Sequence, residues 1–170
     1  MINIITGDIR SGKTTKLISL FEQDKKGDGF ACKKVIKNGK FIGYDIIHLQ
    51  SKKHTSFAYL KKYTSRNWNK KFQFSRFSFS EEGIKFAEKI INSVIKNNVE
   101  PIFIDEIGPV EINLKKGFYK LIKVVLNSER ECFLTVRNDM IDEFVEVFDV
   151  DEFNIIEITP QSSQWSTNDV

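Results

Sequence analysis

Residues 1–15, MINIITGDIRSGKTT, change character abruptly in the middle. Residues 1–6 form a β-rich apolar run, which is typical of a strand buried on both faces. A glycine-containing stretch follows at once, and a helical pattern begins at about Lys13 and ends near Lys26. Residues 7–15 fit the pattern G-x-x-x-x-G-K-[ST] between a strand and a helix, which is the context that this pattern requires. The stretch therefore predicts a phosphate-binding loop.

The chemistry of such a loop explains its residue types. Glycines let the backbone curl so that successive N–H groups point at phosphate oxygens, and the helix N-terminus adds partial positive charge. Lys13 adds a full positive charge, and Thr14 is predicted to ligate Mg²⁺ bound to the nucleotide. The predicted nucleotide-binding residues of the loop are Gly7, Asp8, Ile9, Arg10, Ser11, Gly12, Lys13, Thr14 and Thr15.

A second stretch, FIDEIGPVE at residues 103–111, ends an apolar run with two adjacent acids, Asp105 and Glu106. In proteins with a phosphate-binding loop, a carboxylate at the end of a neighbouring buried strand holds magnesium, and we assign that role to Asp105. Successive side chains of a strand point to opposite sides, so Glu106 is predicted to activate water as a general base. The alternative is that Glu106 is a solvated acid that merely ends the strand.

The rest of the chain alternates strand-like and helix-like segments. Asn38-Gly39 between two strand-like runs predicts an antiparallel hairpin. The further predicted strands are 29–37, 40–50, 54–60, 72–79, 101–105, 131–136 and 154–158, and the further predicted helices are 81–98, 114–127 and 139–148. This order predicts a three-layer α/β fold whose mainly parallel sheet carries an antiparallel hairpin insertion.

Two further groups are candidates for contact with the γ-phosphate. Proteins with a glutamate such as Glu106 usually insert one strand between the loop strand and the aspartate strand, and 131–136 is the natural candidate. Arg137 or Asn138 would then follow that strand beside the phosphates, although Arg137 is equally well explained as a solvated loop cation. Arg10 brings a second cation into the loop itself.

The composition limits the type of protein. A chain of 170 residues with 41% hydrophobic content predicts one domain, residues 1–160, followed by a polar tail, residues 161–170. No apolar run approaches the roughly 20 residues that cross a bilayer, and the first residues lack a signal-peptide pattern, so we expect a cytoplasmic protein without a membrane partner. Cys32 and Cys132 are expected to be free thiols.

Charge is distributed unevenly along the chain. Residues 46–80 contain six lysines, two arginines and no acid, whereas residues 138–170 contain nine acids and no lysine or arginine. The basic stretch is also rich in aromatic residues, so single-stranded nucleic acid is one candidate partner. The favoured interpretation is that the aromatic residues face a core and that the cations form a solvated rim or pair with the acidic third.

Several motifs together resemble the cancer-related nucleoside-triphosphatase family. They are residues 7–15, GFACKKVIKNGKFIGYDI at 29–46, FIDEIGPVE at 103–111 and FLTVRND at 133–139, and the resemblance spans about residues 1–160. It implies a RecA-like α/β fold and Mg²⁺-dependent hydrolysis of nucleoside 5′-triphosphates with broad base tolerance. It also implies nucleotide binding by residues 7–14 and by the stretch around 99–106, which includes Ile104, Asp105 and Glu106.

The sequence departs from this family in two places. Arg10 stands where the family commonly has glycine, and the spacer from Glu111 to Gly117 is one residue longer than expected. An arginine before the Gly-Lys pair also occurs in some nucleotide kinases, which makes a phosphotransferase the second interpretation. A kinase usually clamps its substrates with several arginines of a lid, and the five arginines of this chain include no such pair.

The sequence thus predicts a magnesium-dependent nucleoside-triphosphatase. The predicted catalytic residues are Glu106, Lys13, Arg137 and Arg10, and the predicted magnesium ligands are Thr14 and Asp105. A nucleotide or nucleoside kinase and a nucleic-acid-binding module regulated by nucleotide are the alternatives. The sequence gives no indication of an oligomeric state.

Overall fold

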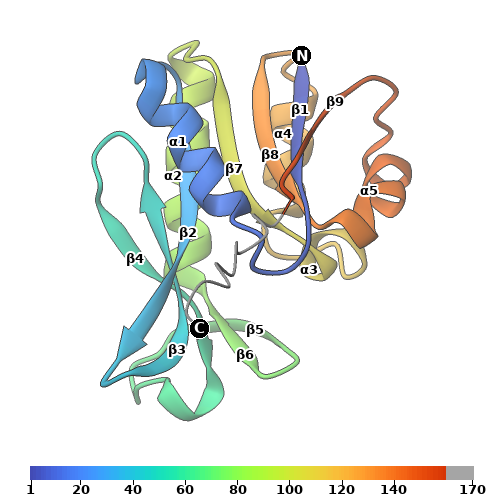
Figure 1. Ribbon diagram of the computed structural model, residues 1–170. Helices are drawn as coiled ribbons and strands as arrows, with labels where there is room; N and C mark the ends of the chain where they lie inside the picture. Colours follow the sequence, from blue (N-terminus) through green and yellow to red (C-terminus); the bar gives the residue numbers. More distant parts are fainter. Residues whose placement is uncertain (160–170) are drawn as a thin grey trace, which may run out of the picture.

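The computed structural model describes residues 1–159, which form one nine-stranded sheet with helices on both faces (Figure 1). The strands are β1 (Ile2–Thr6), β2 (Asp28–Lys37), β3 (Lys40–His48), β4 (His54–Leu60), β5 (Lys70–Phe74), β6 (Phe77–Ser80), β7 (Ile102–Ile107), β8 (Cys132–Val136) and β9 (Asn154–Glu157). The α-helices are α1 (Lys13–Asp24), α2 (Glu81–Lys96), α3 (Pro109–Ile112), α4 (Tyr119–Leu126) and α5 (Ile141–Phe148). Single 3₁₀ turns cover Lys61–Tyr63 and Asn138–Met140.

The sheet has a parallel half and an antiparallel half. Its strand order is β5-β6-β4-β3-β2-β7-β8-β1-β9. Strands β2, β7, β8, β1 and β9 pair in parallel, as expected for strands joined by helical crossovers. Strands β2 to β6 pair antiparallel and form an extension of the sheet that is larger than the single predicted hairpin. Strand β8 lies between β1 and β7, as predicted for 131–136.

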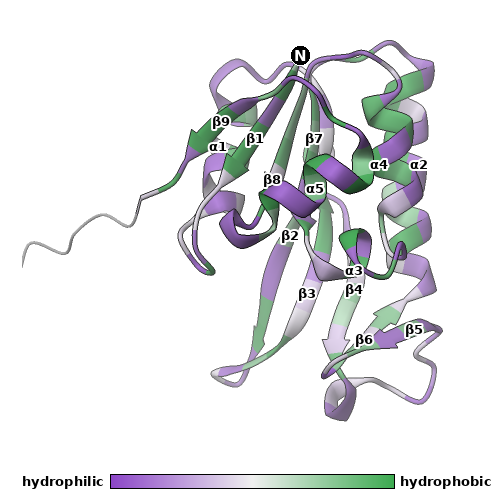
Figure 2. Cartoon of the chain, turned by 90° about the vertical axis from the view of Figure 1, so that its right-hand side faces the viewer, coloured by the Kyte–Doolittle hydropathy of each residue, from purple (hydrophilic) through white to green (hydrophobic). Residues whose placement is uncertain are grey.

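The helices bury two cores against the sheet. Helix α1 covers one face through Leu17 and Phe21, which pack with Phe103 of β7. Helices α2, α4 and α5 cover the other face, and their apolar residues join the larger core. Figure 2 shows α1 on one side of the strands and α2 and α4 on the other. The predicted three-layer α/β architecture is therefore confirmed.

Three predicted elements have different boundaries in the structure. The segment 72–79 is two strands, because Ser75 turns the chain with a left-handed φ of 51° and Phe74 pairs with Phe77. The predicted helix 114–127 begins only at Tyr119, because left-handed residues at Lys115 and Gly117 interrupt it. A short helix, α3, precedes this interruption. The predicted helix 139–148 begins as a 3₁₀ turn.

Most aromatic residues of the basic stretch belong to the core. Phe79 is buried and stacks on Phe72, with ring centroids 4.6 Å apart, and Phe57 packs edge-on against Phe79 at 5.3 Å. Trp68 donates a hydrogen bond to the hydroxyl of Ser78 over 2.9 Å. This packing agrees with the favoured interpretation that the aromatic side chains of 46–80 face a core. Nucleic-acid binding by this stretch stays a prediction.

The two charge blocks lie at opposite ends of the sheet. The basic stretch contains β4, β5 and β6, whereas the described part of the acidic third contains α5 and β9 (Figure 1). Within residues 1–159, no ion pair joins the two blocks; Lys52 pairs instead with Glu22 at 2.5 Å, and Lys71 pairs with Glu81 at 3.3 Å. Of the two expected arrangements, pairing of the basic stretch with the acidic third is therefore not found among the described residues, and the solvated rim is the one that agrees with the structure. The predicted tail, 161–170, lies outside them.

The structure also describes the two cysteines and the lengths of the helices. Cys32 and Cys132 are both buried and unbonded, which confirms the prediction of free thiols. Among the residues that the structure describes, no helix is both long and apolar enough to span a bilayer.

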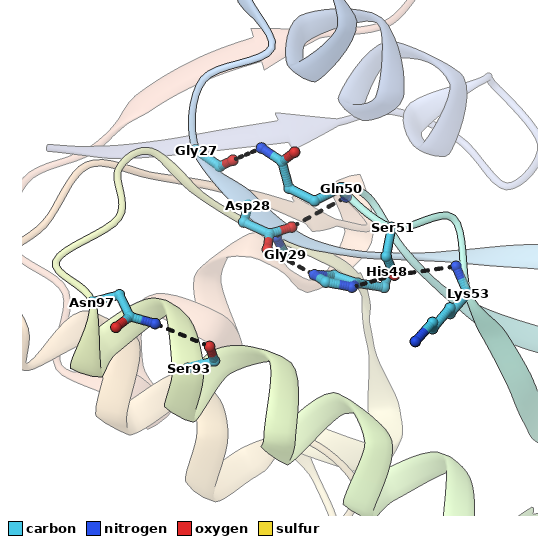
Figure 3. Close-up of polar contacts among 9 residues, drawn as sticks. All are labelled: Gly27, Asp28, Gly29, His48, Gln50, Ser51, Lys53, Ser93 and Asn97. Carbon is cyan, nitrogen blue, oxygen red and sulfur yellow. Dashed lines mark hydrogen bonds and ion pairs between the residues drawn. The ribbon is translucent and has the colours of Figure 1, made fainter.

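A polar network anchors the start of β2 to the turn after β3 (Figure 3). One Asp28 oxygen accepts hydrogen bonds from the backbone N–H groups of Gly29, over 2.7 Å, and Gln50, over 3.3 Å. The other oxygen is hydrogen-bonded to Nε2 of His48 at 2.7 Å, and Nδ1 of His48 is bonded to the hydroxyl of Ser51 at 2.7 Å. Asp28 thus holds together two segments that are distant in sequence at one end of the sheet.

We predict that Asp28→Ala lowers the free energy of unfolding by about 1–3 kcal/mol, because it leaves backbone donors and His48 without their acceptor. Urea denaturation measures this change. Ser93→Ala is a matched control, since the Ser93 hydroxyl accepts only from the Asn97 amide, on the exposed side of α2 (Figure 3). Equal effects of the two substitutions would show that the Asp28 network is not stabilising.

Candidate functional site

The loop between β1 and α1 leaves the N-terminus of α1 open. Gly12 is the N-cap of α1, with a left-handed φ of 103°, and no side chain accepts from the first N–H groups of the helix. A Cβ atom built on Gly12 would have no neighbour within 4 Å, so space lies beside these donors. Arg10 is also left-handed, with φ 68°, and it completes the curl of the loop. Unpaired N–H groups at a helix N-terminus next to open space form an anion site.

Lys13 is held across this loop. Its ammonium group donates hydrogen bonds to the carbonyl oxygens of Gly7 and Asp8, each over 2.8 Å. Partial burial lowers the pKa of Lys13, while the carboxylates of Glu106 and Asp105 oppose that change. The lysine and both acids therefore belong to one electrostatic site, although they come from distant segments of the chain.

A β-bulge places the two acids. Strands β7 and β8 pair Ile104 with Leu134 and Ile107 with Val136, so Asp105 and Glu106 together lie opposite Thr135. Glu106 adopts a left-handed φ of 65°, which is uncommon outside glycine. The predicted difference in orientation is present, because Asp105 is buried and Glu106 is exposed. Its cause is the bulge and not the simple alternation of a regular strand.

Thr135 locks this bulge. Its hydroxyl donates to a carboxylate oxygen of Asp105 over 2.7 Å and accepts from the backbone N–H of Glu106 over 2.8 Å. The second Asp105 oxygen accepts from the backbone N–H of Cys32, in β2, over 2.9 Å. Thr135 is not among the predicted site residues, because a threonine in a strand carries no sequence signal of such a bridge.

The environment of Asp105 suits a cation. Burial raises the pKa of Asp105, and hydrogen bonding by Cys32, Thr135 and Thr14 opposes this rise. Thr14 is therefore near the same carboxylate. In addition, Ser11 Oγ in the loop is buried without a hydrogen-bond partner. Residues 1–159 contain no cluster of three His, Cys, Asp or Glu side chains able to hold a metal alone, so the ion would need phosphate oxygens as further ligands.

Glu106 is placed to exchange a proton. Solvent reaches its side chain, yet desolvation by surrounding protein atoms and the adjacent Asp105 carboxylate raise the pKa of Glu106 to about 7. The positive charges of Lys13, Lys34 and Arg137 counteract this rise. A carboxyl group with a pKa near neutrality can accept a proton and later release it.

The other candidate residues lie at the rim of the site. Arg137 is paired with Asp139, and its charge reaches both Lys13 and Glu106. Asn138 donates a hydrogen bond to the carboxylate of Asp8 over 2.9 Å, so it ties the end of β8 to the phosphate-binding loop. Arg10 and Asp8 are exposed. Arg137 and Asn138 therefore lie next to the phosphate-binding loop, to which Asp8 and Arg10 themselves belong.

Glu111 was not among the predicted site residues, although it belongs to the quoted motif. It is buried, and its carboxylate accepts hydrogen bonds from the backbone N–H groups of Gly108, over 3.2 Å, and Phe118, over 3.1 Å. These bonds close the loop around α3, directly behind Glu106. Burial raises the pKa of Glu111 to about 8. The acid has a structural role that only its tertiary contacts reveal.

The open helix N-terminus with Lys13, together with a buried aspartate two strands away, defines a P-loop nucleoside-triphosphatase site on an α/β sheet. A family model described as NTPase matches residues 3–170. The chain belongs to this NTPase family, and it is an enzyme of the nucleoside-triphosphatase class.

Individual relatives agree with this assignment. The nucleoside-triphosphatase THEP1 of Saccharolobus solfataricus is 31% identical over 130 residues, which are 74% of this chain and 70% of the relative. The crystal structure of THEP1 from Aquifex aeolicus superposes with a TM-score of 0.72 at 24% identity and covers 94% of this chain and 91% of that one. A human cancer-related nucleoside triphosphatase gives a TM-score of 0.66 at 17% identity, with 94% and 89% covered. The predicted family resemblance is confirmed.

We predict that Thr135→Val lowers the free energy of unfolding by about 1–3 kcal/mol, since it leaves the Glu106 N–H and an Asp105 oxygen without their partner. Thr135→Ser keeps the hydroxyl and loses one methyl group, which costs about 1 kcal/mol. Chemical denaturation of both variants measures the difference. A serine variant as unstable as the valine variant would show that the hydroxyl bridge is unimportant.

We predict that the free energy of unfolding of the wild-type protein, compared with that of Glu111→Gln, falls as the pH rises. The folded-state pKa of about 8 exceeds the unfolded value of about 4.3, so the folded chain retains a proton that the unfolded chain has lost. The stability that protonated Glu111 contributes is fully present below the unfolded pKa of about 4.3, and it is lost as the pH rises from there through about 8. Urea denaturation between pH 5 and 9 measures it, with the exposed Glu146→Gln as control. Parallel pH curves for all three proteins would contradict the prediction.

Proposed function

We propose that the protein hydrolyses nucleoside 5′-triphosphates to diphosphate and phosphate in a magnesium-dependent reaction with broad base tolerance. The observation that carries the proposal is the bulge of β7, which aims a buried acid, Asp105, and an exposed acid, Glu106, at the edge of the sheet where the phosphate-binding loop opens. We also propose a cytoplasmic location, where both free cysteines would stay reduced.

Binding would rest on the loop and its lysine. The N–H groups at the start of α1 and the ammonium group of Lys13 hold the β- and γ-phosphates. Thr14 and Asp105 hold Mg²⁺, supported by the proximity of the Thr14 hydroxyl to the Asp105 carboxylate. The bound ion would neutralise phosphate charge in the transition state.

The hydrolytic step would depend on Glu106. Its carboxylate accepts a proton from a water molecule while the water oxygen bonds to the γ-phosphorus and the bond from that phosphorus to the bridging oxygen of the β-phosphate breaks. The nucleoside diphosphate leaves with the bridging oxygen. Arg10 and Arg137 provide positive charge at the rim, where charge develops on the transferred group. A pKa of about 7 suits Glu106 to this exchange near neutral pH.

The proposed base tolerance follows from which atoms the site can contact. The assigned groups, from Gly7 to Thr15 and at Asp105 and Glu106, are suited to phosphate oxygens, a cation and water. None of these groups is assigned to the edge of a base. Discrimination between bases needs hydrogen bonds to those edges, so a site that reads only phosphates accepts several nucleotides.

We predict that Lys13→Ala loses nucleotide affinity, whereas Glu106→Gln retains affinity and loses about 10²–10⁴-fold in turnover. Lysine contacts the phosphates in the bound state, but the glutamate acts only on the attacking water. Phosphate release from ATP, GTP, CTP and UTP, with and without Mg²⁺, measures turnover, and calorimetry with a non-hydrolysable triphosphate measures affinity.

Glu152→Gln is the control for this experiment, because Glu152 is exposed in the segment between α5 and β9, outside the assigned machinery. It is expected to behave as the wild type in both assays. Turnover by Glu106→Gln equal to that of the wild type would remove Glu106 from the mechanism, and equal rates with and without Mg²⁺ would remove the magnesium requirement.

A further inference from the structure

A cavity of about 200 Å³ lies behind Glu106, on the side away from the phosphate-binding loop. Glu106 is one of its walls and is therefore shared between the cavity and the phosphate site. Most of the remaining wall is apolar or aromatic. The principal aromatic residues are Tyr44, Phe57, Phe77 and Phe79, and the other lining residues include Cys32, Ala58, Val110 and Glu111.

The antiparallel extension of the sheet builds this cavity. Residues Tyr44 of β3 and Ala58 of β4 are direct partners across the strands, and Ala58 in turn pairs with Phe79 of β6. These side chains share one face of the sheet, and the segment around α3 forms the opposite wall. Figure 1 shows β3, β4 and β6 below the parallel strands, next to the end of the sheet where α3 lies.

Two aromatic rings at the cavity are accessible to a ligand. Tyr44 and Phe77 are only partly buried, with ring centroids 5.9 Å apart. The guanidinium group of Arg76 lies 5.4 Å from the centre of the Phe77 ring but does not line the cavity. Aromatic walls with a few polar groups are typical of sites that take a flat heterocyclic ligand.

The triphosphate of the proposed reaction would not occupy this cavity. Strand β7 lies two strands from β1, about 10 Å at the usual spacing, and β2 and β3 lie beyond β7. A γ-phosphate that faces Glu106 therefore places the α-phosphate and the nucleoside back toward β1. The cavity lies on the far side of Glu106, in the direction from which an acceptor would approach the γ-phosphorus.

We propose that this cavity is a second binding site, for a nucleoside whose hydroxyl group competes with water for the γ-phosphoryl group. The base would lie against the exposed parts of Tyr44 and Phe77, and the hydroxyl would reach the Glu106 carboxylate. This inference rests on the proposed function, since it uses the same general base and the same bound triphosphate.

The chemical step parallels hydrolysis. The hydroxyl oxygen of the nucleoside bonds to the γ-phosphorus, its proton passes to Glu106, and the bond to the bridging oxygen of the β-phosphate breaks. The products are a nucleoside monophosphate and the nucleoside diphosphate that leaves. A hydroxyl acceptor needs a base such as Glu106, and the described lining of the cavity contains two acids, Glu106 and Glu111, but no lysine or arginine to hold the phosphate of a nucleoside monophosphate. We therefore assign the site to an uncharged nucleoside.

The test measures binding and transfer separately. Calorimetric titration of adenosine, guanosine, cytidine and thymidine into the full chain, without triphosphate, is expected to detect binding of at least one of them. Tyr44→Leu and Phe77→Leu are expected to weaken that binding about tenfold, because they replace a stacking ring by an aliphatic group. With ATP labelled in the γ-phosphate, the wild type is expected to transfer part of the label to the bound nucleoside.

Phe41→Leu is the matched control. Its ring packs 5.2 Å from Tyr44 and 6.2 Å from Phe77, but Phe41 does not line the cavity, so nucleoside affinity is expected to stay at the wild-type value. Thermal unfolding of all three variants separates lost binding from lost folding. Titration of AMP provides a further comparison and is expected to show weaker binding than adenosine.

The outcomes distinguish this inference from the proposed function. Hydrolysis of ATP without binding of any nucleoside overturns the second site and leaves the triphosphatase intact. Nucleoside binding without transfer of label, in an enzyme that releases phosphate, overturns the acceptor role. Nucleoside binding that is lost in Tyr44→Leu, in a protein that neither hydrolyses nor transfers, supports the cavity as a site while overturning the proposed reaction.

Discussion

The hydroxyl bridge from Thr135 to the bulge of β7 is the interaction on which the site depends. A regular strand would pair Asp105 and Glu106 with two residues of β8, but here both lie opposite one threonine. The left-handed Glu106 is a strained conformation for a residue with a side chain, and such a conformation persists only where surrounding contacts hold it. The bridge satisfies the N–H group that the bulge frees and orients the buried carboxylate at the same time.

The same arrangement explains why two neighbouring acids are tolerated. Burial favours a protonated carboxyl group and raises the pKa of both Asp105 and Glu106, and repulsion by the Asp105 carboxylate raises the pKa of Glu106 further. Lys13 lies close enough to offset part of the cost, and its own pKa reflects both acids. The three groups therefore form one electrostatically coupled set. A bound triphosphate and its cation would add charges of both signs to this set, so its protonation must be considered together with the ligand.

The antiparallel half of the sheet gives the molecule a second kind of surface. The parallel half carries the phosphate-binding loop and the paired acids, as in other sheets that bind ligands at the carboxyl ends of their strands. Strands β3 to β6 add aromatic side chains and enclose a cavity behind Glu106. Glu106 lies on the border between the two halves. In the reactions that we propose, one carboxylate would serve water on one side and an organic acceptor on the other.

The sequence by itself determined the phosphate-binding loop, the aspartate strand and the α/β architecture, because a local pattern specifies each: GDIRSGKTT between a strand and a helix, and an apolar run ending at Asp105. Only the tertiary structure decided how the acids are held. Thr135 acts through a partner 30 residues away in sequence, and Glu111 closes its loop through Phe118, so neither contact leaves a periodic signal. The cavity likewise required pairing of strands that are distant in sequence. Patterns of neighbouring residues indicate local conformation. Long-range pairing of strands determines which groups are buried and which charges lie together, and these two properties decide the chemistry of the site.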